Sequence, residues 1–166
     1  MNHRVLGYML RFSAAFFVLV SAAYPIELYT TTAEIVQDAP HVASVMVEEG
    51  SLQGSVLVYK LLVTEDFKGS LPERIEVRIP VLAEMGTSRT PEASGSQWLL
   101  MLGNGVNNLY PLRSINWGKI PIVINEEGQM ALGRNLTGFG GHPFRGKSFT
   151  LSEFREVTRS YRKGSK

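Results

Sequence analysis

The sequence contains no cysteine among its 166 residues. Disulfide bonds, which stabilise many small exported domains, are therefore excluded, as is a lipoprotein anchored through a lipidated cysteine. Zinc sites with thiolate ligands are excluded for the same reason. The fold of this chain must depend on packing and hydrogen bonds alone.

Histidine is also scarce, with only His3, His41 and His142 in the whole chain. None of them has a second histidine at the spacing of a zinc-binding pair, so the sequence predicts no metal site. A serine-hydrolase elbow, a phosphate-binding lysine loop and a dinucleotide-binding glycine motif are absent as well. We therefore expect no cofactor.

Acidic residues occur as neighbouring pairs rather than at spacings that converge. Adjacent residues on a strand point to opposite faces of a sheet, so a neighbouring pair does not form an acid/base couple. We interpret these pairs as solvated strand ends, predict no catalytic residue and expect a protein that is not an enzyme. The pairs are Glu48-Glu49, Glu65-Asp66 and Glu126-Glu127.

The chain lacks a long hydrophobic run. Its most apolar stretch, Phe12–Tyr24, has 13 residues, fewer than the roughly 20 that span a bilayer as a helix. Arg4 and Arg11 precede this stretch, and Ser21-x-Ala23 lies near its end. This is the pattern of a secretory signal peptide over residues 1–23. Cleavage after Ala22 and retention as an anchor are the alternatives. We expect a periplasmic or extracellular protein that meets the membrane only through this segment.

The mature chain also lacks an excess of charge of either sign. Two of the 17 Lys and Arg residues, and none of the 15 Asp and Glu residues, lie in residues 1–23, so 15 of each remain. The basic isoelectric point of the full sequence thus comes mainly from the signal segment and gives no support for a nucleic-acid partner. Residues 24–166 are long enough for one domain with a packed core.

Alternating apolar residues mark the clearest secondary structure, within Val56–Pro80. In Ile75–Ile79 apolar residues alternate with charged ones, as in a strand with one face in a core and the other in water. A turn at 68–72 separates this strand from a strand at Val56–Thr64. The second face of Val56–Thr64 is only partly polar, which predicts that another element covers part of it.

The rest of the chain predicts further strands, one short helical turn at 32–37 and a C-terminal helix at 151–162. Thr150 and Glu153 form the pattern of a capping box at the start of this helix, and Leu151, Phe154, Val157 and Tyr161 recur at helical spacing. Exposed loops are expected at 81–97 and 133–147. The further strands are His41–Glu49, Trp98–Leu102 (buried on both faces), a weak strand at Leu109–Ile115, Ile120–Asn125 and Gln129–Leu132.

Short motifs over residues 33–160 resemble a pattern common in exported bacterial proteins of an uncharacterised family. They are the corner Glu65–Gly69, the alternating strand Ile75–Ile79, Gly118-Lys119-Ile120, the turn at Gly128, and Leu151-Ser152-Glu153-Phe154. The pattern is similar to the barrel of the tissue inhibitors of metalloproteinases, a netrin-like domain. This resemblance implies a mainly β fold, a small five-stranded barrel like that of oligonucleotide/oligosaccharide-binding (OB) folds with a C-terminal helix. Those inhibitors chelate zinc through an N-terminal cysteine, which this chain lacks.

These observations favour an exported, non-enzymatic binding module for a protein or polysaccharide of the cell envelope. Its contacts are expected on the barrel face and on loops 81–97 and 133–147, with Trp117 and His142 as candidate binding residues. Two alternatives stay open. One is a steric protease inhibitor that fills a cleft without chelation, and the other is a small hydrolase that uses His142 with a nearby carboxylate.

Overall fold

The computed structural model describes residues 31–81, 88–114, 118–134 and 149–163, with side chains as far as Arg159. The predicted signal peptide at 1–23 and the candidate residues Trp117 and His142 lie outside the described residues. The same holds for most of the predicted loop 133–147.

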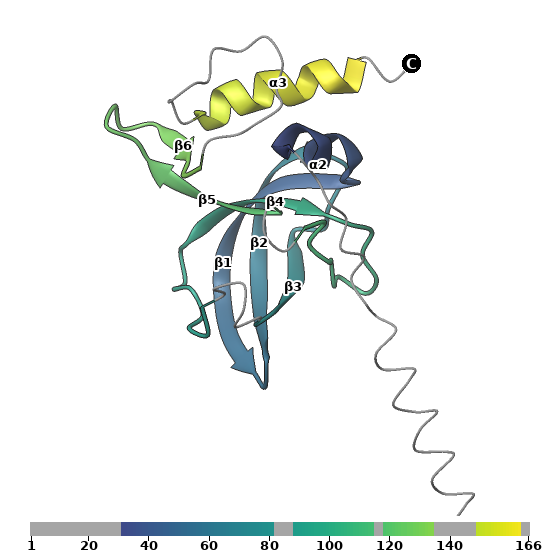
Figure 1. The fold of residues 1–166 in the computed structure, drawn as a ribbon, viewed down its shortest axis with the longest axis vertical. Coiled ribbons are helices and arrows are strands. Elements are labelled where there is room, and N and C mark those ends of the chain that lie inside the picture. The colour runs from purple at the N-terminus through teal and green to yellow at the C-terminus, as the bar shows by residue number, and fades with distance from the viewer. Residues whose placement is uncertain (1–30, 82–87, 115–117, 135–148, 164–166) are drawn as a thin grey trace, which may run out of the picture.

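Six strands form one antiparallel sheet in the order β3-β2-β1-β4-β5-β6 (Figure 1). The prediction of a mainly β fold is confirmed; the sheet has six strands where five were predicted, and it is not closed. The chain after the Gly128 turn adds a sixth strand, and β3 and β6 remain the two ends of the ladder. The strands are β1 (His41–Gln53), β2 (Val56–Lys68), β3 (Arg74–Pro80), β4 (Gln97–Leu102), β5 (Lys119–Ile124) and β6 (Met130–Leu132).

β1 and β2 form a long hairpin that dominates the sheet. Pairing runs from Val42↔Lys68 to Gln53↔Val56, and Gly54 takes a positive φ of 64° in the tight turn. The predicted end of the first strand at Glu49 is wrong, because β1 continues through Gly50 to Gln53. Gly50 stays in the strand because its bare Cα faces the ring of Tyr59, where an added Cβ would lie 2.9 Å from Cε1.

One face of the sheet carries a core made mainly by strands, which we call the strand core. β4 contributes alternate residues to it and its remaining apolar residues to the opposite face, so the prediction that this strand is buried on both faces is confirmed. The alternating apolar residues of β3 all point into the strand core, as predicted. Its members are Ala43, Val45, Val47, Leu57, Tyr59, Leu61, Ile75, Val77, Ile79, Trp98, Leu100, Leu102 and Leu112.

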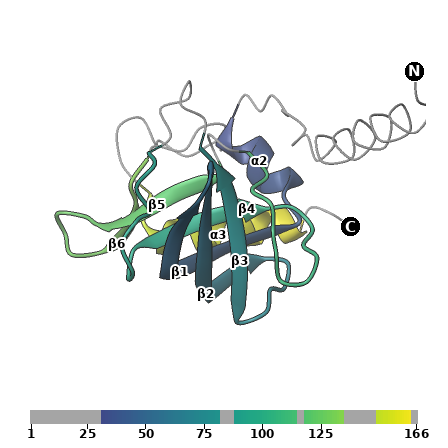
Figure 2. The same cartoon turned by 90° about the horizontal axis from the view of Figure 1, so that it is seen from below.

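The opposite face is covered by two helices, α2 (Thr32–Asp38) and α3 (Leu151–Lys163), as Figures 1 and 2 show. Together they enclose a second cluster, the helix core, which includes Phe67 of β2 and Phe154 of α3 in edge contact with ring centroids 5.2 Å apart. Leu151, Phe154 and Val157 belong to this core as predicted. On the second face of Val56–Thr64, Val58 is buried while Lys60 and Thr64 are exposed, so the predicted partial covering of this face is confirmed.

Both helices begin with a reciprocal cap. At α3 the Thr150 N–H donates to Glu153 Oε2 over 2.7 Å and the Glu153 N–H donates to Thr150 Oγ1 over 3.2 Å, which confirms the predicted capping box. Thr31 and Glu34 form an equivalent box at α2. Arg155 of α3 then reaches Glu65 of β2 through two parallel hydrogen bonds of 2.6 and 2.7 Å. The helix is therefore fixed at its start and along its first turns.

The connector between β4 and β5 replaces the weak strand predicted at Leu109–Ile115. Among its described residues only single bridges form, because Asn107 and Asn108 take left-handed φ values of 52° and 64° and Pro111 lacks an N–H. The connector nevertheless bonds to two strands. Tyr110 N–H donates to Glu76 O of β3 over 2.9 Å, and Gly103 N–H at the end of β4 donates to Pro111 O over 2.9 Å.

Candidate functional site

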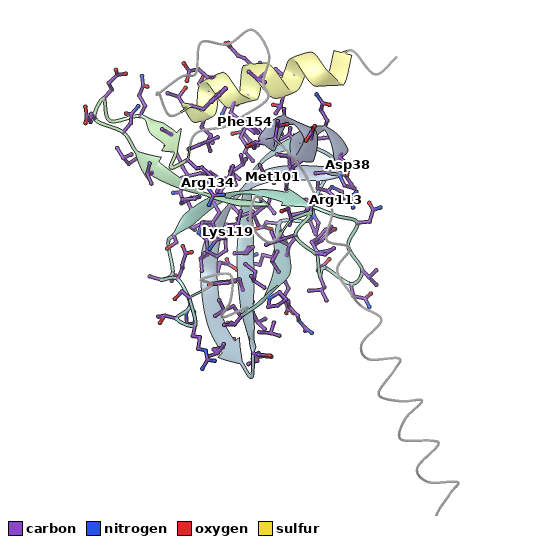
Figure 3. The ribbon with its side chains drawn as sticks, viewed as in Figure 1. Asp38, Met101, Arg113, Lys119, Arg134 and Phe154 are labelled. Carbon is purple, nitrogen blue, oxygen red and sulfur yellow. The ribbon has the colours of Figure 1, made fainter. Side chains whose placement is uncertain are left out.

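The carboxylate of Glu92, in the described part of the loop before β4, joins several polar groups on the strand-core side. Its Oε2 accepts a hydrogen bond from the Trp98 indole, Nε1 to Oε2 2.8 Å, and its Oε1 accepts one from the ammonium of Lys119. The Lys119 Nζ also lies 4.2 Å from the centroid of the Trp98 ring. Figure 3 places Lys119 on the strand-core side of β5. One carboxylate thus connects the loop to β4 and β5.

Tyr59 extends this network into the strand core. Its ring meets the Trp98 ring edge to face, with centroids 4.7 Å apart and planes at 87°, and its hydroxyl oxygen accepts the N–H of Glu92 over 3.2 Å. Burial raises the pKa of the Tyr59 phenol, the Glu92 N–H bond opposes that rise, and the Glu92 carboxylate adds to it. This cluster holds the loop over the core. Its one carboxylate is already shared between two donors, and its other titratable groups are the Lys119 ammonium and the Tyr59 phenol.

A second polar cluster lies where the end of α2 meets the end of β2. Lys68 donates through Nζ to the carbonyl oxygens of Val36 and Gln37 at the end of α2, and burial lowers the pKa of the Lys68 ammonium while the charge of Asp38 opposes that shift. Asp38 itself forms an ion pair with Arg113 of the connector (Figure 3). These contacts terminate the helix and fix it to the sheet.

His41, the first residue of β1, lies beside this cluster. Its ring contacts Tyr110 edge to face with centroids 5.5 Å apart. Its Nδ1 is buried and has no hydrogen-bond partner among the described residues. A Cβ at Gly69 would lie 2.4 Å from this nitrogen, so the corner after β2 closes tightly over the imidazole. The described side chains around His41 thus present no hydrogen-bonding group to Nδ1.

The hairpin of β5 and β6 presents three large apolar side chains to solvent, more than any other described element of the sheet. Its ladder with β4 ends at Trp98↔Pro121, while the ladder with β6 continues to Ile124↔Met130. The hairpin therefore extends past the end of β4 (Figure 1). Val123 is 44% exposed, Ile124 66% and Met130 38%.

The turn of this hairpin is well ordered by its own hydrogen bonds. Asn125 Oδ1 accepts the N–H groups of Glu127 and Gln129, over 3.1 and 2.8 Å, and Gly128 takes a φ of 76°. The predicted turn at 126–128 is confirmed. Glu126 and Glu127 are exposed, and neither forms an ion pair with a described residue. Apolar side chains on a rigid hairpin with a negatively charged tip are suited to binding a partner.

The sequence did not identify this hairpin as a site. It predicted strands at Ile120–Asn125 and Gln129–Leu132 and assigned neither a binding role. The signal that was available is the run Ile122-Val123-Ile124 directly before a polar turn. Three consecutive aliphatic residues place apolar groups on both faces of a strand, and a two-stranded hairpin can cover only part of them.

The described part of the chain contains neither a cluster of metal ligands nor a membrane-spanning helix. No three histidine, aspartate or glutamate side chains of residues 31–81, 88–114, 118–134 and 149–163 gather as metal ligands. Neither α2 nor α3 is long and apolar enough to cross a bilayer. No protein-family model matches the sequence, and no curated protein is significantly similar to it.

Proposed function

We propose that this protein is an exported, non-enzymatic binding module of the cell envelope that contacts a partner protein through the β5–β6 hairpin. The observation that carries the proposal is the exposure of Val123, Ile124 and Met130 on an ordered hairpin. Burying an aliphatic side chain of this size in an interface contributes roughly 1.5–3 kcal/mol. Exposed apolar groups gathered on one element are typical of interaction sites.

The chemistry of the hairpin favours a protein partner over a polysaccharide. Sugar rings are commonly bound by stacking on aromatic side chains, and the exposed apolar residues of this hairpin are aliphatic. Of the described aromatic residues, Trp98, which pairs with Pro121 of β5, and Phe149, which bonds to Leu132 of β6, are fully buried. Aliphatic and methionine side chains fit the apolar centre of a protein interface instead.

Export is part of the proposal and depends on the sequence of residues 1–23, with Arg4 and Arg11 around the start of the apolar run and Ser21-x-Ala23 at its end. A fusion of these residues to a reporter that is active only outside the cytoplasm tests it directly. The expected result is reporter activity that is lost when the apolar run is interrupted by charged residues. Equal activity of both fusions would contradict export.

An OB-like ancestry of the sheet is also part of the proposal. In support, the connector donates from Tyr110 to Glu76 of β3 and accepts at Pro111 from Gly103 of β4, so it lies between the two strands that an OB barrel would bring together. On this interpretation the connector takes the place of a closing strand. An experimental structure with β3 and β4 far from the connector would contradict it.

Site-directed photocrosslinking in intact cells tests the binding function. A photoreactive residue at Ile124 or Met130 is expected to yield one defined crosslinked protein, and one at exposed Ser70, in the turn between β2 and β3, is expected not to. Ile124→Asp is then expected to abolish the crosslink from position 130 without changing the thermal unfolding of the protein. Crosslinks of equal strength from all three positions would contradict the proposal.

The same hairpin also suits the steric protease inhibitor, because it extends past β4 and has a rigid turn. This second candidate predicts that the purified protein inhibits an exported protease and that Ile124→Asp weakens the inhibition. Titration against a panel of exported proteases, with and without the substitution, distinguishes it. If no protease of the panel is inhibited, the protease-inhibitor candidate is contradicted and binding to an envelope protein remains as the proposal.

A further inference from the structure

β5 has an unpaired edge where it extends past β4. Alternate residues of a strand direct their backbone N–H and C=O groups to opposite edges. Pro121 O accepts from Gly133 N–H and Asn125 N–H donates to Gln129 O, so these odd-numbered positions face β6. Ile124 accordingly directs its backbone groups to the other edge. Among the described residues, no strand pairs with that edge beyond Pro121.

The two residues directly before β4 bond to β1 and not to this edge. Gly95, with a φ of 89°, donates its N–H to Val47 O over 2.8 Å, and Val47 N–H donates to Ser96 O over 2.8 Å. The far edge of the hairpin, on β6, is occupied, since Leu132 N–H donates to Phe149 O over 2.7 Å. Of the two edges of the hairpin, the described residues leave open only the one on β5.

The side chains beside this edge specify what fits it. Ile124 and its cross-strand neighbour Met130 form an apolar surface on one face. The turn that follows carries the carboxylates of Glu126 and Glu127, both exposed and without an ion pair to a described residue. A complementary segment is therefore apolar where it meets Ile124 and positively charged where it reaches the turn.

We infer that the open edge of β5 binds an extended segment of a partner polypeptide by strand addition. The segment pairs with the backbone of Ile124, places apolar residues against Ile124 and Met130, and carries a Lys or Arg beside Glu126 and Glu127. Backbone hydrogen bonds supply affinity in this mode of recognition, and alternate side chains supply specificity. The inference rests on the proposed function, because it names the chemistry and binding mode of the partner at the same hairpin.

A defined peptide and a matched pair of variants test the inference. The probe is a synthetic peptide of alternating valine and threonine with lysine at both ends, titrated into the purified full chain by fluorescence anisotropy. Ile124→Pro removes the edge N–H and obstructs the edge, whereas Ile124→Ala shortens the side chain and keeps the N–H. Because Ile124→Pro loses one backbone hydrogen bond to the peptide, we expect its dissociation constant to be about fivefold higher than that of Ile124→Ala.

Two controls address fold and charge. The backbone N–H of Ile124 points away from β6 and bonds to no residue of that strand. Ile124→Pro is therefore expected to leave the circular dichroism spectrum and the urea midpoint near those of Ile124→Ala. Glu126→Gln combined with Glu127→Gln is expected to weaken binding of the lysine-flanked peptide and to reduce its dependence on salt. A peptide flanked by glutamate, or one with methylated backbone nitrogens, is expected to bind more weakly than the probe.

Several results would overturn the inference. Equal affinity of Ile124→Pro and Ile124→Ala, equal affinity for the N-methylated peptide, or no binding of the probe would each exclude strand addition. If the crosslinks from Met130 persist in Ile124→Pro, the hairpin still binds a partner, and only the strand-addition mode fails. Sedimentation experiments test whether a second copy of the chain binds the edge instead. If the native chain dimerises with rising concentration and Ile124→Pro does not, the edge binds a second copy, and the inference of a different partner polypeptide is overturned.

Discussion

The ammonium of Lys119 lies 4.2 Å from the centroid of the Trp98 ring, and both side chains donate to the carboxylate of Glu92. Trp98 is fully buried, while the side chains of Lys119 and Glu92 are 26% and 40% exposed. The indole bond is therefore the more valuable of the two, because an ion pair in contact with water contributes little. The loop before β4 is therefore held mainly by the hydrogen bond from the buried Trp98 indole to Glu92.

This relationship predicts the cost of replacing Glu92. Glu92→Ala leaves the indole N–H of Trp98 without its acceptor, and we expect the free energy of unfolding in urea to fall by about 1–3 kcal/mol. Glu92→Gln keeps a carbonyl acceptor and is expected to cost less. The control is Glu127→Ala, whose side chain is exposed at the hairpin turn. If Glu92→Ala and Glu127→Ala unfold at the same urea concentration, the indole bond does not stabilise the fold.

Tyr59 predicts a loss of stability in alkaline solution. Its burial raises the pKa of the phenol above the ordinary value of 10.0. Below pH 10 the folded and unfolded states both hold the proton, and above it the unfolded state loses the proton first. The free energy of unfolding therefore falls as the pH rises from about 10 to the pKa of the folded state.

The measurement is urea unfolding across this pH range for the native chain and for Tyr59→Phe. The variant also loses the acceptor of the Glu92 N–H, so its stability is lower at every pH, and the slopes with pH are compared rather than the absolute values. We expect a shallower alkaline slope for Tyr59→Phe. Identical slopes would show that Tyr59 ionises equally readily in both states.

The predictions that held are those in which a local pattern determines the structure. The continuous apolar run of β4 requires burial on both faces, and Thr150 with Glu153 satisfies backbone groups within one turn of helix. Gly50 was misjudged as a strand end because its role depends on the ring of Tyr59, which reaches it only through the register of β1 with β2.

Local sequence patterns could not predict whether the sheet closes or where the candidate site lies, for a related reason. Whether a sheet closes depends on how its end strands meet, and here the backbone bonds between β3 and the described residues of the connector are made at Glu76. The sequence also gave no hint that Glu92 joins Trp98 to Lys119, which lie in different strands. The exposure of Ile124 follows from the position at which the ladder between β4 and β5 ends. Strand propensities do not predict that position.

Gly69 offers a comparison that separates steric contact from backbone strain. It takes a φ of 79°, and an added Cβ would lie 2.4 Å from His41 Nδ1 and 2.7 Å from Pro40 O. Gly54 takes a φ of 64° with nothing within 4 Å of an added Cβ. Gly54→Ala is therefore expected to cost about 1–2 kcal/mol, the strain of a left-handed alanine alone.

Gly69→Ala carries the same strain and in addition displaces the imidazole and the Pro40 carbonyl. We expect its free energy of unfolding to fall by at least about 1 kcal/mol more than that of Gly54→Ala. Urea unfolding of both variants at one pH provides the measurement. Equal losses would mean that the corner after β2 relaxes away from His41 at no cost.

The cap of α3 gives a prediction that separates the helix from the sheet. Thr150→Ala removes the hydroxyl that accepts the Glu153 N–H, and we expect it to cost about 1 kcal/mol of stability. Ser152→Ala, two residues further on and exposed, removes a hydroxyl that no described contact uses and is expected to change little. Because α3 covers Phe67 and Leu132 of the helix core, faster amide exchange in Thr150→Ala should appear first in α3 and then in β6. Equal exchange in both variants would show that packing of Phe154 alone holds the helix.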